Sequence, residues 1–173
     1  METFLELLKY ILPSLIMFGG VYFVLNKFLD TEHRKQLLEL RQENQKITTP
    51  LRLQAYERLV LFLERMAMDK LVLRINKPGM SAQLLKADLL RTIQQEFDHN
   101  LTQQLYTSNT AWDTVKTAKD ESLKIVNMAA AQVKPDAQGV ELGQKIFEIM
   151  MKLDKSPAQI AVLILKKEIR QLF

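Results

Sequence analysis

The first 29 residues contain one long apolar run that no charge interrupts. Between Lys9 and Lys27 the chain reads YILPSLIMFGGVYFVLN. Counted from Phe4 to Leu25, with Glu6 and Lys9 reaching out to the interface, the span is about 20 residues long, which is enough to cross a hydrocarbon core of about 30 Å as a helix. The pattern therefore predicts a single transmembrane anchor within residues 1–29.

The flanks of this run favour a retained anchor over a cleaved signal peptide. A signal peptide needs a positive start and small residues at its cleavage site, whereas this chain starts Met-Glu-Thr and the run ends Val-Leu-Asn-Lys. Lys27, Arg34 and Lys35 follow the run, and Lys9 precedes it. Because positive residues stay on the cytoplasmic side, we expect a single-pass protein of the inner (cytoplasmic) membrane. Its residues 4–28 would contact lipid and its C-terminal domain would be cytoplasmic.

The next segment, residues 30–48, is strongly charged and poor in apolar residues in its second half. Two interpretations stay open: a helix that continues the anchor as one rod, or a solvated linker. A rod from Glu2 to Ile47 would be about 70 Å long at 1.5 Å per residue. Thr49 and Pro50 then predict a fresh helix start, because threonine caps helices well and proline is favoured at the first helical position.

Residues 49–173 repeat apolar positions three and four apart, the spacing of one helical face. Glycine and proline breakers and caps divide them into five segments, which cover about 49–75, 81–105, 111–133, 139–153 and 156–173. Ser156 and Gln159 make a capping box around Pro157, the clearest of the helix starts. Short connections favour antiparallel neighbours. The prediction is an all-α fold, with one N-terminal transmembrane helix followed by a cytoplasmic bundle of about five helices.

The same spacing predicts which side chains form the core. The expected stripes are Leu53, Tyr56, Val60, Leu63 and Ala67; Leu85, Leu89, Ile93, Phe97, Leu101 and Leu105; and Ala111, Val115, Ala118, Ser122, Ile125, Ala129 and Val133. Trp112, near Tyr106, is either a partner hot spot or a corner of the core, and we favour the core. The last helix, with three basic residues, either lies on a membrane or partner or is the last core helix, and again we favour the core.

Composition narrows the chemistry. The chain has no cysteine, which excludes a disulfide framework, a thiolate zinc site and a cysteine nucleophile. The net charge is +4, and from Lys27 to Lys77 there are 11 positive and 7 negative residues. A positive excess next to a bilayer suits anionic headgroups better than a duplex, so we expect no nucleic-acid partner. Gly139 and Gly143 lie outside the anchor, so we expect them only to permit close helix contact.

One polar stretch offers a candidate site. Glu96 and His99 are three residues apart, as in the Glu-x-x-His units of di-iron bundles. Such sites need a second unit, and the other histidine, His33, has no glutamate three residues before it. We therefore expect no metal, no cofactor and no catalytic residue. The stretch is better explained as an interaction face, made of Glu96, His99, Asn100 and Gln103.

Two segments resemble a known family. Ile47–Arg58 (ITTPLRLQAYER) and Gln95–Leu101 (QEFDHNL), together with Trp112, look like an uncharacterised bacterial family of short proteins. Its members have one N-terminal membrane helix and a helical cytoplasmic region. The resemblance covers most of the chain and implies this architecture alone, since the family has no assigned activity to transfer.

Three functions follow from these features. The first is a non-enzymatic, membrane-anchored scaffold or accessory subunit that binds another protein, or a second copy of itself, through the cytoplasmic helices. The second is an anionic-lipid surface binder that uses Lys27, Arg34, Lys35 and the last helix. The third, and least favoured, is a metal-dependent enzyme centred on Glu96 and His99.

Overall fold

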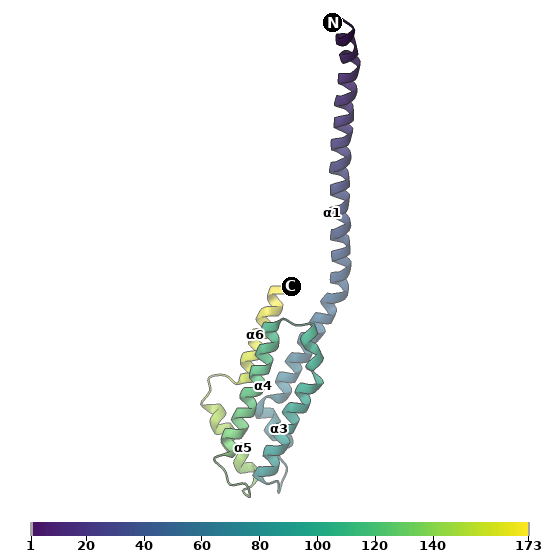
Figure 1. The fold of residues 1–173 in the computed structure, drawn as a ribbon. Coiled ribbons are helices and arrows are strands. Elements are labelled where there is room, and N and C mark those ends of the chain that lie inside the picture. The colour runs from purple at the N-terminus through teal and green to yellow at the C-terminus, as the bar shows by residue number, and fades with distance from the viewer. Residues whose placement is uncertain (1, 173) are drawn as a thin grey trace. The chain divides into compact units, whose positions relative to one another are not determined.

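The structure is a computed structural model that describes the backbone of residues 2–172 and the side chains of residues 11, 13 and 15–171. All regular structure in this part of the chain is helical, apart from an isolated bridge between Ser81 and Gln138. The helices, shown in Figure 1, are α1 (Glu2–Met66), α2 (Met68–Ile75), α3 (Ala82–His99), the 3₁₀ helix η1 (Leu101–Leu105), α4 (Asn109–Ala130), α5 (Gly139–Met151) and α6 (Pro157–Leu172). The chain divides into two compact units, Met1–Thr49 and Pro50–Phe173.

The first unit is the N-terminal part of α1. This helix is continuous from Glu2 to Met66, so the rod interpretation is confirmed and the linker is wrong. The fresh start at Thr49 and Pro50 is wrong as well. A proline deprives Lys46 of its backbone partner, but its fixed φ is itself helical, and the residues on both sides keep the helical conformation.

The predicted membrane span falls in this unit. Within the residues whose side chains are described, no helical segment is long and apolar enough to cross a membrane. The expected span of Phe4–Leu25 includes residues 4–10, 12 and 14, whose side chains lie outside the described set. The anchor therefore stays a prediction.

The second unit is a bundle in which α4 lies beside α3, α5 and α6 (Figure 1). Most of the expected stripe positions are buried here: Tyr56, Leu63, Leu85, Leu89, Ile93, Phe97, Ala111, Val115, Ala118, Ser122, Ile125 and Ala129. Of the other expected core residues, Val60, Ala67 and Val133 are partly buried, and Leu53 is exposed. The helical period thus predicts the core-facing side of each long helix.

The chain leaves the helical conformation at Ala67, which the sequence analysis placed inside one helix. Ala67 has φ −55° and ψ 123°, and α2 begins at the next residue. Met66 and Met68 are 1% and 2% exposed. Residues two apart on a single helix point to different sides, so the break is what allows both methionines to enter the core.

The predicted helix starts are confirmed where a serine is present. The Ser81 hydroxyl accepts from the Leu84 amide at 3.2 Å, and the Ser108 hydroxyl accepts from the Ala111 amide at 3.0 Å. In the capping box, the Gln159 amide donates to the Ser156 hydroxyl at 3.1 Å. The Ser156 amide donates to the Gln159 side chain at 3.0 Å. Each of these bonds satisfies a backbone donor that the first turn of a helix leaves free.

The predicted burial of Leu101 and Leu105 is wrong. They are 39% and 77% exposed, because α3 ends at His99 and the chain continues as the 3₁₀ helix η1. A 3₁₀ helix has three residues per turn instead of 3.6. Ile93 and Phe97, four residues apart on α3, both face the core. After the change of helix type, residues that continue this spacing no longer do so.

The last helix is a core helix, as favoured, and small residues make up half of its buried face. Its buried residues are Ala158, Ala161, Val162 and Leu165. The larger residues Ile160, Leu163 and Ile164 are 47%, 50% and 38% exposed. Ile160 and Ile164 line a hollow of about 610 Å³ beside α4. Small residues let α6 approach α4 closely, which leaves the bulkier side chains at the edge of the contact.

Gly139 and Gly143 permit close contact between α5 and the segment around α2, as expected. A Cβ atom on Gly143 would lie 3.2 Å from a methyl carbon of Val72. One on Gly139 would lie 2.7 Å from the side-chain oxygen of Asn76 and 3.1 Å from the Met80 carbonyl oxygen. Glycine is therefore needed at the start of α5 for steric reasons.

Tyr56 ties three parts of the bundle together through its hydroxyl. The hydroxyl donates to Glu168 Oε1 on α6 at 2.7 Å and accepts from the Ser108 amide at 3.4 Å. Burial raises the pKa of the Tyr56 phenol, and the hydrogen bond to the Glu168 carboxylate raises it further. The phenol therefore stays protonated and acts as a donor at neutral pH.

Replacing Tyr56 by phenylalanine is expected to lower the free energy of unfolding by about 1–2 kcal/mol, because the ring stays packed while two hydrogen bonds are lost. Trp112 is the one tryptophan in the chain and lies in this core. Its fluorescence during urea unfolding of the full-length protein in mild detergent measures the change. Tyr106→Phe is the matched control, since Tyr106 is 42% exposed and should change nothing. Equal stability of the Tyr56→Phe variant and the parent would show that the hydroxyl does not stabilise the bundle.

Candidate functional site

A groove of about 600 Å³ opens between the C-terminal part of α1 and the end of α3, within the second unit. Its lining combines two apolar residues with polar and charged ones: Arg58, Leu61, Phe62, Arg65, Thr92, Gln95, Glu96, His99 and Asn100. Of the α1 residues, Phe62 is buried in the core beside Leu59 and Leu63, whereas Arg58, Leu61 and Arg65 are exposed. Core packing thus directs the arginines outward.

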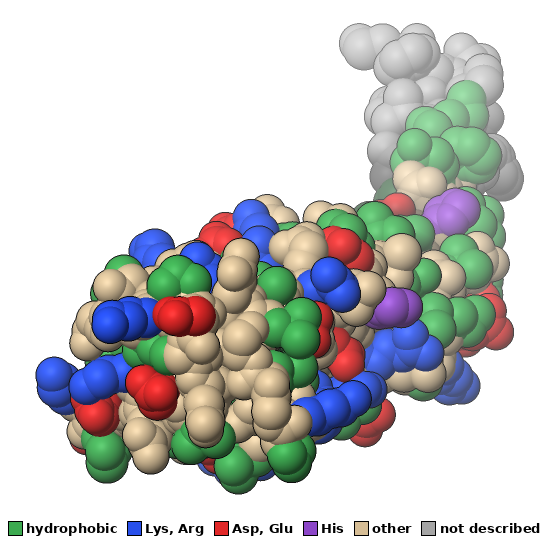
Figure 2. Space-filling view, turned by 90° about the horizontal axis from the view of Figure 1, so that it is seen from below, with side chains coloured by type: hydrophobic (Ala, Val, Ile, Leu, Met, Phe, Trp, Pro, Cys, Tyr) green, Lys and Arg blue, Asp and Glu red, His purple; other side chains and the backbone are tan. Residues whose placement is uncertain are grey.

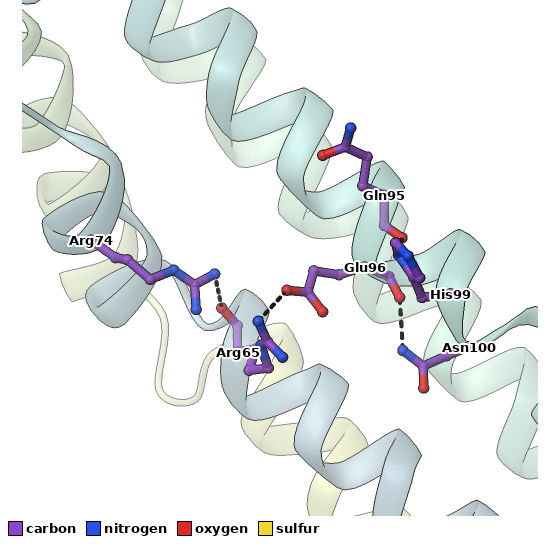
Figure 3. A network of polar contacts seen from close by, with 6 residues as sticks. All are labelled: Arg65, Arg74, Gln95, Glu96, His99 and Asn100. Atoms are coloured by element: carbon purple, nitrogen blue, oxygen red, sulfur yellow. Dashed lines mark hydrogen bonds and ion pairs between the residues drawn. The ribbon is translucent and has the colours of Figure 1, made fainter.

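One wall of the groove is fixed by an ion pair between the two helices. Arg65 Nη2 lies 2.8 Å from Glu96 Oε1, and the Glu96 side chain is only 19% exposed (Figure 3). Arg74 of α2 donates to the Arg65 backbone carbonyl at 3.2 Å. The partly buried carboxylate is therefore neutralised by a neighbour that is itself held at the end of α1.

The opposite end of the groove is the C-terminus of α3. His99 Nδ1 lies 2.7 Å from the Gln95 carbonyl oxygen, and Asn100 Nδ2 donates to the Glu96 carbonyl oxygen at 2.7 Å (Figure 3). A carbonyl can only accept, so Nδ1 must carry the hydrogen. His99 Nε2 is then left for a ligand, as an acceptor in the neutral ring and as a donor in the charged ring.

The groove has an excess of positive charge. Arg58 and Arg65 stand against the single carboxylate of Glu96. Arg58 is exposed, and no ion pair of it is found among the described residues. Guanidinium groups bind carboxylates through two parallel hydrogen bonds. The arrangement is suited to hold an acidic group beside the apolar side chains of Leu61 and Phe62.

Three of the four residues expected on the interaction face, Glu96, His99 and Asn100, line this groove. Gln103 does not, and its expected exposure is wrong. It is 8% exposed, and its side chain donates to Thr102 Oγ1 at 3.3 Å. The change from α-helix to 3₁₀ helix at Leu101 rotates it into the core.

Sequence reasoning missed the residues that α1 contributes, chiefly Arg58, Leu61 and Arg65. Their spacing of three and four residues is a helical face of its own, adjacent to the buried stripe. Two arginines seven residues apart were the available signal. Only the packing of α1 against α3 shows that this face meets Glu96 and His99.

The candidate lipid contacts lie in the first unit. Lys27, Arg34 and Lys35 are all exposed on α1. Residues seven and eight apart share a helical face, so the three cations lie on one side of the helix. Their role in lipid binding stays a prediction.

Two further hypotheses concern the second unit. Trp112 is 8% exposed and stacks on Phe97 with ring centroids 5.3 Å apart, so the interpretation of Trp112 as a core residue is confirmed. In the described part of the chain, no three histidine, aspartate or glutamate side chains lie close enough together to hold a metal ion. Figure 2 shows acidic and basic side chains interspersed over one face of the protein.

Comparisons with known proteins give one match. Neither the curated proteins nor the solved structures contain a significant match to this chain. A family model covers residues 2–172, nearly the whole length, in agreement with the resemblance to an uncharacterised family. The chain therefore belongs to the family of unknown function DUF7935.

Proposed function

We propose that this protein is a non-enzymatic, membrane-anchored adaptor that binds an acidic segment of a partner protein in the groove between α1 and α3. The observation that carries the proposal is the groove lining, which combines Arg58 and Arg65, against one carboxylate, with the apolar side chains of Leu61 and Phe62. Interfaces of this kind combine arginine, aromatic and aliphatic side chains.

The anchor is the second part of the proposal. From Leu15 to Leu29 the described apolar side chains of α1 are exposed, with Met17 and Phe18 at 71% and 72%. A helix that is apolar on all sides is covered by a core or by a membrane. The uncharged run between Lys9 and Lys27 supports the membrane. The positive residues after it support a cytoplasmic bundle.

The groove is tested by charge reversal. The double variant Arg58→Glu, His99→Ala is expected to reduce at least tenfold the recovery of a partner cross-linked in native cells, because a lost charge-assisted bond of about 1.5–3 kcal/mol changes affinity by this factor or more. Quantitative mass spectrometry of the purified full-length protein measures the recovery.

The matched control is Arg91→Glu. Arg91 is exposed, as Arg58 is, but it belongs to α3, pairs with Asp88 at 3.4 Å and lies outside the groove. Its loss should leave the recovery unchanged. If the double variant retained every companion of the parent protein, the groove would not be the binding site.

A further inference from the structure

A second pattern lies on α1, in the charged segment that follows the predicted span. Leu37, Leu40, Asn44 and Ile47 are spaced three, four and three residues apart. The three apolar members are 56%, 56% and 66% exposed. In sequence the spacing continues four residues later at Leu51, which is 42% exposed. The segment therefore carries an apolar stripe that nothing in its own unit covers.

The spacing of this stripe is that of a coiled coil. Alternation of three and four is the heptad repeat, with Leu37, Asn44 and Leu51 at a positions and Leu40 and Ile47 at d positions. A single asparagine at an a position fixes the register and favours two strands, at a cost in stability. Asn44 is the one polar residue among these five positions.

The positions that flank the stripe are compatible with a copy of the same helix. In a parallel pair each g residue meets the e residue of the next heptad on the other strand. Here Gln36 would meet Arg41 and Glu43 would meet Thr48. Neither pair places like charges together, so a homotypic parallel pair carries no repulsion at these contacts.

The exposure of this part of α1 also favours a partner. Most helical stability in proteins comes from packing of an apolar face rather than from helix propensity. Between residues 30 and 48 the described side chains are exposed, apart from the partly exposed Glu32. A second copy that covers the leucines would supply the missing packing.

We propose that residues 37–51 pair with the same residues of a second copy in a parallel, in-register, two-stranded coiled coil. The parallel direction rests on the proposed membrane anchor, since two chains that start in the same membrane with the same orientation run the same way. The partner of this surface is thus the chain itself, while the groove between α1 and α3 is left for another protein.

The absence of cysteine allows a direct test. Leu40→Cys and Ile47→Cys are made separately in the full-length protein, and intact native cells are mildly oxidised before fractionation. A disulfide requires Cα atoms closer than about 7 Å, so each d-position cysteine should form a cross-linked dimer. Leu38→Cys is the matched control, because Leu38 is an equally exposed leucine (55%) at a b position, outside the stripe. It should cross-link at least tenfold less.

Each outcome decides between the possibilities. Equal cross-linking at positions 38 and 40, or none at either d position, would overturn the coiled coil. Cross-linking at only one d position would indicate an antiparallel pair, which brings at most one residue opposite itself, and would overturn the proposal as stated. Fractionation of the same samples tests the anchor separately from the coiled coil. Cross-linked dimers in the soluble fraction would refute the anchor alone. Protein that stays in the membrane without cross-linking would refute the coiled coil alone.

Discussion

Replacing Phe97 by alanine is expected to lower the free energy of unfolding of the bundle by about 3–5 kcal/mol, the usual cost of removing a buried phenylalanine. Phe97 is 7% exposed and connects three helices. Its ring centroid lies 6.0 Å from that of Phe62 on α1 and 5.3 Å from that of Trp112 on α4. Lys119 Nζ lies over the same ring at 4.7 Å.

The size of this effect follows from what the ring does. Truncation leaves a cavity among side chains that are themselves fixed, and it removes aromatic contacts worth about 0.5–1.5 kcal/mol per pair. Since typical domains are stable by about 5–15 kcal/mol, the variant should lose a large fraction of the stability of the bundle. Urea unfolding followed by Trp112 fluorescence measures the loss.

One further variant separates the effect of side-chain volume from that of the aromatic contacts, and a second serves as a control. Phe97→Leu keeps most of the volume and should cost less than the alanine variant, with the difference due to the cavity. Leu84→Ala changes a 50% exposed residue of the same helix and should stay within about 0.5 kcal/mol of the parent protein. A change below about 1 kcal/mol in Phe97→Ala would mean that α3 does not pack against α1 and α4 as described.

The helical period predicts the core well wherever a helix is regular. Leu85, Leu89 and Ile93 follow one another at four-residue spacing and are all fully buried. The prediction fails where the backbone changes type, because residue spacing has meaning only for a known number of residues per turn. This explains why Leu105 and Gln103 exchange their expected environments: one is exposed and the other is buried.

Local signals also compete with one another, and the sequence does not show which prevails. A threonine followed by proline suits a helix start, but Pro50 lies inside α1. Ala67 has no local tendency to end a helix, but α1 ends there. In the second case the cost of a backbone break is offset by burial of Met66 and Met68, which is a tertiary effect.

The sequence predicts the part of the candidate site that lies on α3 but not the part that lies on α1. Glu96, His99 and Asn100 are recognisable because they form a polar stretch within an otherwise amphipathic helix. Arg65 is an ordinary charged residue in sequence, and only the distance of 2.8 Å to Glu96 assigns it to the groove. Residues 31 positions apart in the chain meet through the packing of two helices, which the spacing within either helix does not contain.

The proposed membrane anchor leads to the other large expected effect. Phe18→Arg is expected to move most of the protein from the membrane to the soluble fraction, because an arginine at the centre of a span costs about 2.5–3.5 kcal/mol, a factor of roughly 100 in insertion. Phe18 lies near the middle of residues 10–26 and is 72% exposed on α1. Alkaline extraction of isolated membranes, followed by immunoblotting of both fractions, measures the shift.

Phe28→Arg is the matched control, since it introduces the same charge in place of the same residue on the same helix. Phe28 is 63% exposed and lies at the predicted edge of the span, where a long cationic side chain reaches the headgroups. It should therefore leave the protein in the membrane. If the parent protein itself detached in high salt, binding through Lys27, Arg34 and Lys35 would explain its location better than an anchor, since surface electrostatics are screened by salt whereas an inserted helix is not. If instead both arginine variants and the parent stayed in the membrane after alkaline extraction, residues 10–26 would not be the segment that holds it there.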